Sequence, residues 1–162
     1  MCEPVLRYRT VAVLMGLALL AGCAATSPQR GKPAPEPVRS PEQAREWSRQ
    51  GMLAHQQGQT DEAIEALQQA VALNPADAPT ANNLALLLKQ QNRFSEAAGV
   101  LATALSASPD VADLHYNLAV ISELYLLDLP SALTHYQRYT ELSAEEDKAV
   151  TGWIADLQRR LQ

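Results

Sequence analysis

The sequence predicts an all-α fold, in which three helix-turn-helix units stack into an α-solenoid that ends in a C-terminal capping helix. The main observation is a self-similarity at a spacing of 34 residues between about residues 44 and 144. The segments from Ser40 onward also have the residue pattern of helices. The composition agrees, because 47% of the residues are hydrophobic and only 5% are aromatic, which favours closely packed helices.

Residues 1–22 are predicted to be a secretory signal peptide. Arg7 and Arg9 precede an uninterrupted run of small and apolar residues at 11–21. A helix of that length is about 16 Å long, roughly half of a bilayer's hydrocarbon core, so it is too short to span a membrane and suits a signal sequence. A buried N-terminal helix is the alternative, but the run has no polar face.

The run ends in Leu-Ala-Gly-Cys at residues 20–23, which resembles the lipobox of bacterial lipoproteins. The resemblance implies that Cys23 becomes the acylated N-terminus, since several acyl chains anchor a protein where one does not. Ala24 follows, and the absence of aspartate there is similar to lipoproteins that are exported to the outer membrane. We therefore expect a palmitate-type lipid anchor on the outer membrane, facing the periplasm, with an inner-membrane anchor as the alternative.

Residues 23–41 are predicted to form a disordered linker after the lipidated cysteine. Five of the ten prolines lie between Thr26 and Pro41, and such a segment favours extended polyproline II or disorder. It carries a net charge of +2, from three basic residues and one glutamate. A solvated spacer is the simpler interpretation, and contact with anionic headgroups or cell-wall carboxylates is the alternative.

The three repeat units are predicted at about residues 44–77, 78–111 and 112–144. Small residues recur where the two helices of a unit would cross, and leucines recur where bulk is needed. The third unit aligns only with a shift of 35, so one residue is inserted, and we expect it in the turn near 126–130. The recurring positions are Gly51, Ala85 and Ala119; Ala63, Ala97 and Ala132; Leu67 and Leu101; Leu84 and Leu118; and Pro75 and Pro109.

This period and pattern resemble the tetratricopeptide repeat (TPR), a helix-turn-helix unit of 34 residues. The resemblance implies a protein-protein interaction module, in which the units are stable as a stack. Two departures suit terminal repeats, which are expected to be atypical. Gln50 stands where Leu84 and Leu118 stand, so the first helix is expected to pack less well, and Tyr139 replaces a small residue.

Residues 145–162 are predicted to be the capping helix. Ser143 and Glu146 have the spacing of a capping box, and Arg159 and Arg160 lie where cations complement the helix dipole. Apolar residues from Ala149 to Leu161, Trp153 among them, fall on one stripe that would cover the last repeat. A partner-binding or dimerisation helix is the alternative.

The sequence contains no catalytic constellation, so we expect no enzyme activity, no cofactor and no metal. His55, His115 and His135 belong to three different helices and no motif links them. Residues 42–162 have 16 acidic and 8 basic residues, a net charge of −8, which argues against binding nucleic acid.

In the TPR family the first helix of each pair lines a concave groove that binds peptides or partner helices, and the resemblance implies such a groove here. Met52, Leu86 and Val120 would form an apolar stripe, and Asn83 and Asn117 would hydrogen-bond a ligand backbone or, alternatively, brace neighbouring helices. Ser48 and Asp113 stand where chaperone-binding relatives need lysines. The full predicted set is Arg45, Ser48, Met52, His55, Asn82, Asn83, Leu86, Lys89, Tyr116, Asn117, Val120 and Glu123.

The sequence thus predicts a membrane-anchored adaptor or scaffold for a protein or peptide partner. Similar lipoproteins serve envelope machines, and among these the biogenesis of a pilus or secretion system is favoured. An accessory subunit or regulator of a cell-wall enzyme is one alternative. A self-associating structural oligomer is the other.

Overall fold

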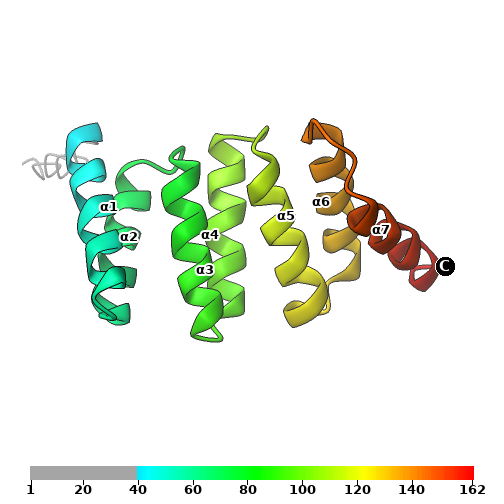
Figure 1. The fold of residues 1–162 in the computed structure, drawn as a ribbon, viewed down its shortest axis with the longest axis horizontal. Coiled ribbons are helices and arrows are strands. Elements are labelled where there is room, and N and C mark those ends of the chain that lie inside the picture. The colour runs from blue at the N-terminus through cyan, green and yellow to red at the C-terminus, as the bar shows by residue number, and fades with distance from the viewer. Residues whose placement is uncertain (1–39) are drawn as a thin grey trace, which may run out of the picture. The chain divides into compact units, whose positions relative to one another are not determined.

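The computed structural model describes residues 40–162, all of them in helices or the short turns between helices. The predicted signal peptide, Cys23 and nearly all of the linker lie outside the described residues. None of the helices in the described part combines the length and apolar character needed to cross a membrane. Figure 1 labels seven helices, α1 to α7. The elements in chain order are α1 (Pro41–Gln56), α2 (Thr60–Leu73), α3 (Ala78–Gln90), α4 (Phe94–Ala107), α5 (Ala112–Ile121), the π-helical turn η1 (Ser122–Leu126), α6 (Leu129–Leu142) and α7 (Lys148–Arg160).

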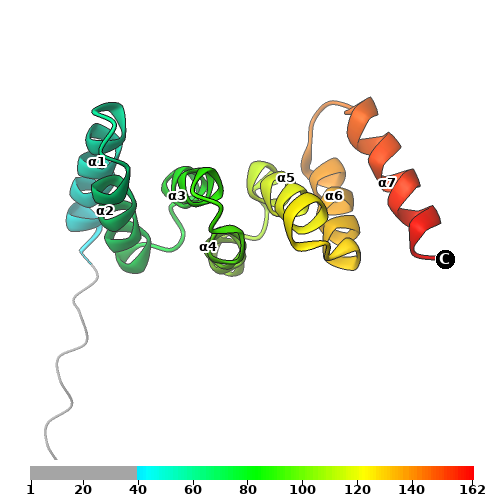
Figure 2. The same ribbon diagram turned by 90° about the horizontal axis from the view of Figure 1, so that it is seen from below.

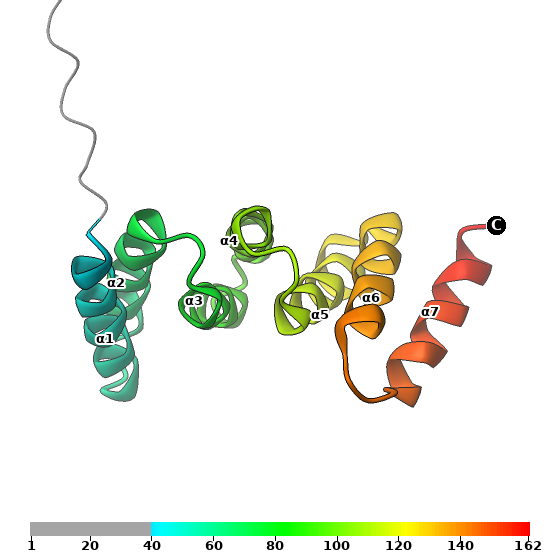
Figure 3. The ribbon, with the colours of Figure 1, turned by 90° about the horizontal axis from the view of Figure 1, so that it is seen from above.

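The helices form three consecutive pairs, α1 with α2, α3 with α4, and α5 with α6, and α7 follows as a single helix. Figures 2 and 3, which view the stack from opposite sides, show α3 and α4 in different layers. The all-α fold predicted from the sequence, with three helix-turn-helix units and a final helix, is therefore confirmed. We call α1, α3 and α5 the first helices and α2, α4 and α6 the second helices.

Side-chain caps start several of the helices. Ser40 accepts a hydrogen bond from the backbone N–H of Gln43 at 3.3 Å and precedes Pro41 at the first helical position, as predicted. Asp77 caps α3 and Asp128 caps α6 in the same way, each followed within two positions by a proline. The N–H groups of a helix's first turn have no partner within the helix, so a proline there costs no hydrogen bond. A capping side chain followed by proline therefore marks the start of each of these helices.

Each pair turns through one residue in the left-handed backbone conformation: Gly58 at φ 76°, Asn92 at φ 59° and Leu127 at φ 56°. Such a residue lets the next backbone N–H reach back to an unpaired carbonyl of the preceding helix. Gln59 donates to the carbonyl of Ala54 and Arg93 to that of Leu88, both at 2.9 Å. The left-handed residues are spaced by 34 and then 35, so the extra residue of the third unit lies before Leu127.

The inserted residue is accommodated inside the helix, which corrects its predicted place in the turn at 126–130. Ser122 is the 34-residue equivalent of Leu88, and its carbonyl accepts from Asp128 at 2.8 Å, one residue further along than in the second unit. The residues between them form the π turn η1, in which a helix takes up one extra residue. Tyr125 of this turn stacks on Phe94, with ring centroids 4.2 Å apart.

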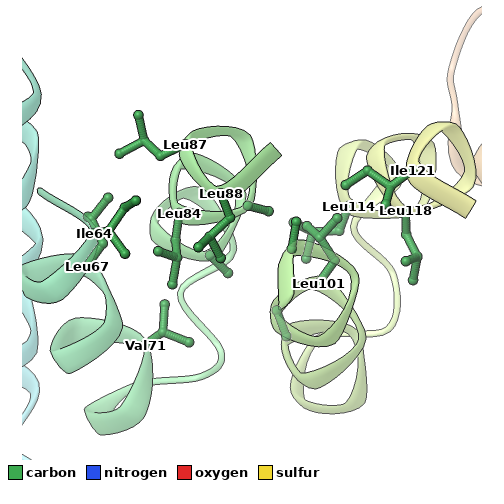
Figure 4. Packing of buried hydrophobic residues seen from close by; sticks show 14 of the residues in the cluster. Ile64, Leu67, Val71, Leu84, Leu87, Leu88, Leu101, Leu114, Leu118 and Ile121 are labelled. Atoms are coloured by element: carbon green, nitrogen blue, oxygen red, sulfur yellow. The ribbon is translucent and has the colours of Figure 1, made fainter. Parts of the chain in front are cut away.

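The small residues lie where the helices of a pair cross. Ala63, Ala97 and Ala132 are fully buried, as are Ala85 and Ala119. Gly51 is the extreme case, because a Cβ atom there would come within 2.7 Å of Leu67 Cγ and 3.1 Å of the Ala63 carbonyl oxygen. Two apolar clusters follow from this packing. The larger joins the first two units to α5, as Figure 4 shows for ten leucine, isoleucine and valine side chains, and the smaller joins α5, α6 and α7.

The last helix begins later than predicted. Ser143 does not start it: the Ser143 N–H donates to the carbonyl of Tyr139 and so ends α6. Asp147 is the N-cap of α7, because its carboxylate accepts from the N–H groups of Ala149 and Val150. The carboxylate of Asp147 accepts two bonds and can satisfy two free N–H groups, which explains why the cap lies there. Val150 and Leu157 are fully buried against α6.

Candidate functional site

The candidate site is the surface formed by the first helices α1, α3 and α5, which we call the first-helix face. Its predicted residues lie at the surface, half-buried rather than in the core. Arg45 and His55 are the most exposed of them and lie on α1. The half-buried ones are Ser48, Met52, Asn82, Asn83, Leu86, Lys89, Tyr116, Asn117, Val120 and Glu123.

A chain of hydroxyl hydrogen bonds ties α1 to α3 on this face. Thr80, which is 3% exposed, donates its hydroxyl proton to the carboxylate of Asp77 at 2.9 Å. Ser48 Oγ lies 2.7 Å from Thr80 Oγ1, and because the threonine proton is already committed, Ser48 is the donor. Ser48 therefore fixes the spacing of two first helices.

The asparagines also bridge neighbouring first helices. Asn83 donates its amide to the sulfur of Met52 at 3.4 Å, and Asn117 donates to the side-chain oxygen of Asn82 at 2.6 Å. Of the two interpretations of these asparagines, bracing thus accounts for one group on each. An amide has both donor and acceptor capacity, so the side-chain oxygens of Asn83 and Asn117 and the amide of Asn82 are still available for a ligand.

Two hollows lie between successive first helices. The one between α1 and α3 has a volume of about 140 Å³ and is lined by Met52, His55, Asn83, Leu86, Leu87 and Gln90. The one between α3 and α5 has a volume of about 230 Å³ and is lined by Ala78, Pro79, Asn82, Asn83, Val111, Asp113 and Leu114. Asn83 borders both hollows, and Lys89 lies on the same helix, α3. The two hollows together form a shallow surface of apolar side chains and amide groups. Each hollow suits one side chain of a ligand.

The end of the predicted groove in the third unit is partly taken up by α7. Tyr116 lies between Tyr139 and Trp153, at ring-centroid distances of 5.2 and 6.4 Å, and Val120 packs against the same small cluster. Trp153 keeps 39% of its surface exposed. The aromatic side chains of this cluster thus bound the C-terminal end of the first-helix face. Tyr139, which stands where the other units have a small residue, packs in this cluster beside α7.

Glu123 serves the internal structure and not the face, in contrast to the prediction. The π turn η1 brings its carboxylate to Tyr136, which donates a hydrogen bond at 3.2 Å, and to Arg160 of α7 at 3.2 Å. Burial, and then the adjacent carboxylate, raise the pKa of the Tyr136 hydroxyl, so it stays protonated and remains a donor. Glu123 thereby links α5, α6 and α7.

Two histidines that the sequence left unconnected meet across the third pair. His115 of α5 and His135 of α6 lie with their Nδ1 atoms 2.9 Å apart, and His115 Nε2 lies 2.9 Å from the carbonyl oxygen of Pro109. A carbonyl can only accept, so His115 carries its proton on Nε2 and His135 donates from Nδ1. Burial, and then His115, lower the pKa of His135. No sequence signal reveals this pair, because its members are 20 residues apart on different helices.

No cluster of three or more histidine, cysteine or carboxylate side chains that could hold a metal ion occurs within residues 40–162. The salt bridges of the described part are mostly between neighbours three or four residues apart, such as Arg49 with Glu46 of α1 at 2.6 Å. The first-helix face thus consists of shallow hollows, apolar patches and amide groups, which are features of a binding surface.

Comparisons with known proteins agree with this geometry. A family model described as a tetratricopeptide repeat matches residues 54–121. No curated protein matches the chain in sequence. Among solved structures, the first TPR of Spaghetti (RPAP3) bound to the HSP90 peptide SRMEEVD has a TM-score of 0.64 at 19% identity, over 75% of this chain and 95% of that one.

Two further structures share the fold. The N-terminal domain of stress-induced protein-1 from C. elegans has a TM-score of 0.63 at 16% identity and covers 76% of this chain and 99% of its own. MamA has a TM-score of 0.65 at 16% identity, over 75% of this chain and 66% of its own. At these identities the likeness is one of fold. Together with the family match at residues 54–121, it shows that the helical part of this chain has the fold of a tetratricopeptide repeat.

Proposed function

We propose that the chain is an adaptor that binds a helix or an extended segment of a partner protein on the first-helix face. The observation that carries the proposal is the pair of hollows between α1, α3 and α5, which Asn83 joins. The asparagine side chains at these hollows each keep one hydrogen-bonding group without a partner in residues 40–162. An apolar side chain of the ligand would enter each hollow, and the amides would fix its backbone.

The charge of this face indicates which ligands fit. The solved structure of the first TPR of RPAP3 contains an HSP90 peptide, SRMEEVD, which has two glutamates and a C-terminal aspartate. Here Ser48 is committed to Thr80 and Asp113 lines the second hollow, so neither supplies a cation for a terminal carboxylate. Lys89 is the one lysine among the predicted face residues. We expect binding that depends on apolar and amide contacts and only weakly on salt.

Crosslinking in cells tests this proposal. A photoreactive amino acid at Met52, Leu86 or Tyr116 is expected to capture the partner, whereas the same group at Ala102 or Ser106, exposed on α4, is not. Leu86→Glu should abolish capture from Met52, because a charge would be desolvated in the hollow that both residues line. Equal capture from α4 and from the first helices would contradict the proposal.

We further propose that Cys23 anchors the protein to the outer membrane on its periplasmic side. Support comes from the sequence alone, in the apolar run at 11–21 and the Leu-Ala-Gly-Cys segment that follows it. A palmitate analogue should label the protein and fail to label Cys23→Ser. Separation of the two membranes by density should place the labelled protein in the outer one. Labelling of the serine variant would contradict the proposed lipidation.

The proposed setting is the assembly of a pilus or secretion system. An adaptor held at a membrane by a lipid and by a spacer that could reach roughly 50 Å can present its binding face to a membrane-spanning machine. Identification of the proteins captured from Met52 and Leu86 tests this directly. Capture of a cell-wall enzyme instead would assign the adaptor to that enzyme.

A further inference from the structure

The outer surface of the first pair holds a second groove, away from the first-helix face. It lies between α1 and α2 and has a volume of about 540 Å³, larger than either hollow described above. We call it the end groove. It is lined by Trp47, Gln50 and Ala54 of α1 and by Glu62, Glu65, Ala66, Gln68 and Gln69 of α2.

The later repeats show what such a groove holds. The residues equivalent to Trp47, Gln50 and Ala54 are all buried in units two and three, with at most 8% of their surface exposed. The leucines among them lie in one apolar cluster with side chains of α2 and α4, the second helices of the preceding units. His115 and Ser122 instead contact His135 and Ser131 of α6. Figure 4 shows Ile64, Leu67 and Val71 of α2 beside the leucines of α3, and Leu101 of α4 beside those of α5. The equivalent residues are Ala81, Leu84 and Leu88 in unit two and His115, Leu118 and Ser122 in unit three.

The two ends of the described stack differ. The C-terminal end is closed, because α7 occupies the position that a next first helix would take and buries Val150 and Leu157 against α6. At the other end α3 packs on one side of the first pair, and no helix of residues 40–162 covers the opposite, outer side of α1 and α2. The position of a preceding second helix is therefore open in the described part, with Trp47 half-exposed beside it.

The charges of the end groove define its ligand. Glu62 and Glu65 are exposed, and no basic side chain of residues 40–162 lies within salt-bridge distance of either. The lining contains no lysine or arginine. Ala54 and Ala66 are small enough to let another helix approach closely. A ligand that complements this surface has an apolar stripe that contacts Trp47 and the two alanines. It also has cationic side chains that pair with the two glutamates.

We propose that the end groove binds a basic amphipathic helix of a protein partner, in the place that α2 takes on α3. The stretch from Trp47 to Ala54 is about 10 Å long, so two to three turns of the ligand helix would fill it. The apolar spacing to expect is that of Ile64, Leu67 and Val71, at positions i, i+3 and i+7. This site is separate from the first-helix face and does not depend on the ligand proposed there.

A second copy of this chain supplies a poorer ligand. Neither α2 nor α4 contains a lysine or arginine. Arg138 of α6 is already paired with Asp110 and Glu141. Arg160 of α7 is already paired with Glu123. The basic helix is therefore expected from a different protein.

Fluorescence of Trp47 tests the proposal. The chain has two tryptophans, so Trp153→Phe leaves Trp47 as the reporter in the full chain. The probe is a 14-residue blocked peptide with leucine at i, i+3 and i+7 and lysine and alanine elsewhere. Its control carries glutamate in place of lysine. We expect the lysine peptide to shift Trp47 emission to shorter wavelength in a saturable way, and the glutamate peptide to leave the emission unchanged.

Matched charge reversals locate the binding. Glu62→Lys with Glu65→Lys should raise the dissociation constant of the lysine peptide about tenfold or more, because the attraction between glutamate and peptide lysine becomes a repulsion between lysines. Glu145→Lys with Glu146→Lys makes the same change in net charge at a distant exposed site and should leave affinity within about twofold. Circular dichroism checks that both variants fold, and a photoreactive group at Gln69 should crosslink to the lysine peptide.

Three results would overturn the proposal. Equal weakening by both charge reversals would mean binding by net charge alone. Trp47 emission that does not respond to the lysine peptide, with no crosslink from Gln69, would mean that the end groove does not bind such a helix. Emission that shifts with protein concentration in the absence of peptide, together with dimers in sedimentation, would assign the groove to a second copy.

Discussion

Replacement of Gly51 by alanine separates the packing of the first pair from the repeat pattern. Alanine occupies the equivalent positions 85 and 119, and it favours a helix over glycine by about 1 kcal/mol. The sequence pattern alone therefore predicts that Gly51→Ala stabilises the protein. The structure predicts the opposite, because the new Cβ would lie 2.7 Å from Leu67 Cγ, 2.9 Å from Leu67 Cδ2 and 3.1 Å from the Ala63 carbonyl oxygen.

The magnitude follows from two opposed terms. Overpacking of a well-packed site costs about 1–3 kcal/mol, and here one of the three contacts is with backbone, which yields only if α2 moves. With the gain of about 1 kcal/mol from helix propensity subtracted, Gly51→Ala should lower the free energy of unfolding by about 1 kcal/mol. The measurement is urea denaturation followed by far-UV circular dichroism, with the m-value compared between variants.

Gly99→Ala and Gly152→Ala are the matched controls. A Cβ at either glycine would meet nothing within 4 Å, so only the propensity term applies. Each should raise the free energy of unfolding by about 1 kcal/mol. If Gly51→Ala stabilises the protein as much as Gly99→Ala does, the close approach of α1 to α2 is not a packing constraint and the reasoning is refuted.

Three further predictions concern the third unit. Leu127→Asn should raise the free energy of unfolding by about 0.5–1 kcal/mol in urea, because asparagine tolerates the left-handed conformation better than leucine; a loss would argue against strain there. Glu123→Ala should lower it by about 1–3 kcal/mol, since the buried Tyr136 hydroxyl loses its acceptor, and Tyr136→Phe in the same background should recover part of the loss. The lowered pKa of His135 means that below its ordinary value of 6.5 the unfolded chain binds the proton more readily, so stability should fall as pH falls through that value towards the lowered one, and His135→Gln should flatten the dependence. An unchanged slope in that variant would contradict it.

Several structural details could be read directly from local sequence. Ser40 and Pro41 have short-range roles, since a hydroxyl caps the N–H three residues ahead, and the observed bond is the expected one. Positions such as Ala97 and Leu101 recur at a fixed spacing because every unit repeats the same crossing, and both are fully buried. The half-buried residues of the first-helix face follow from the same periodicity.

Other details depend on contacts that no local pattern contains. Asp147 and not Ser143 caps α7, because Ser143 ends α6 while the Asp147 carboxylate accepts from the free N–H groups of the last helix. Glu123 was predicted on the binding face, but the π turn rotates it towards Tyr136 and Arg160. A single inserted residue could enter either a turn or a helix, and here it enters the helix, where Tyr125 of the π turn stacks on Phe94 of the unit before.

Taken by itself, the sequence determined the class of fold, the repeat period and the residues that pack within each unit, because these depend on spacings along one chain. Only the tertiary structure decided which side chains of different units meet, as in the His115 and His135 pair and the bridge from Asn117 to Asn82. It also decided that Gln50, a departure from the repeat pattern, lies in an open groove where Leu84 and Leu118 lie in the core. The physical reason is that burial of these positions depends on the preceding unit, and the first pair has no preceding unit within the described residues.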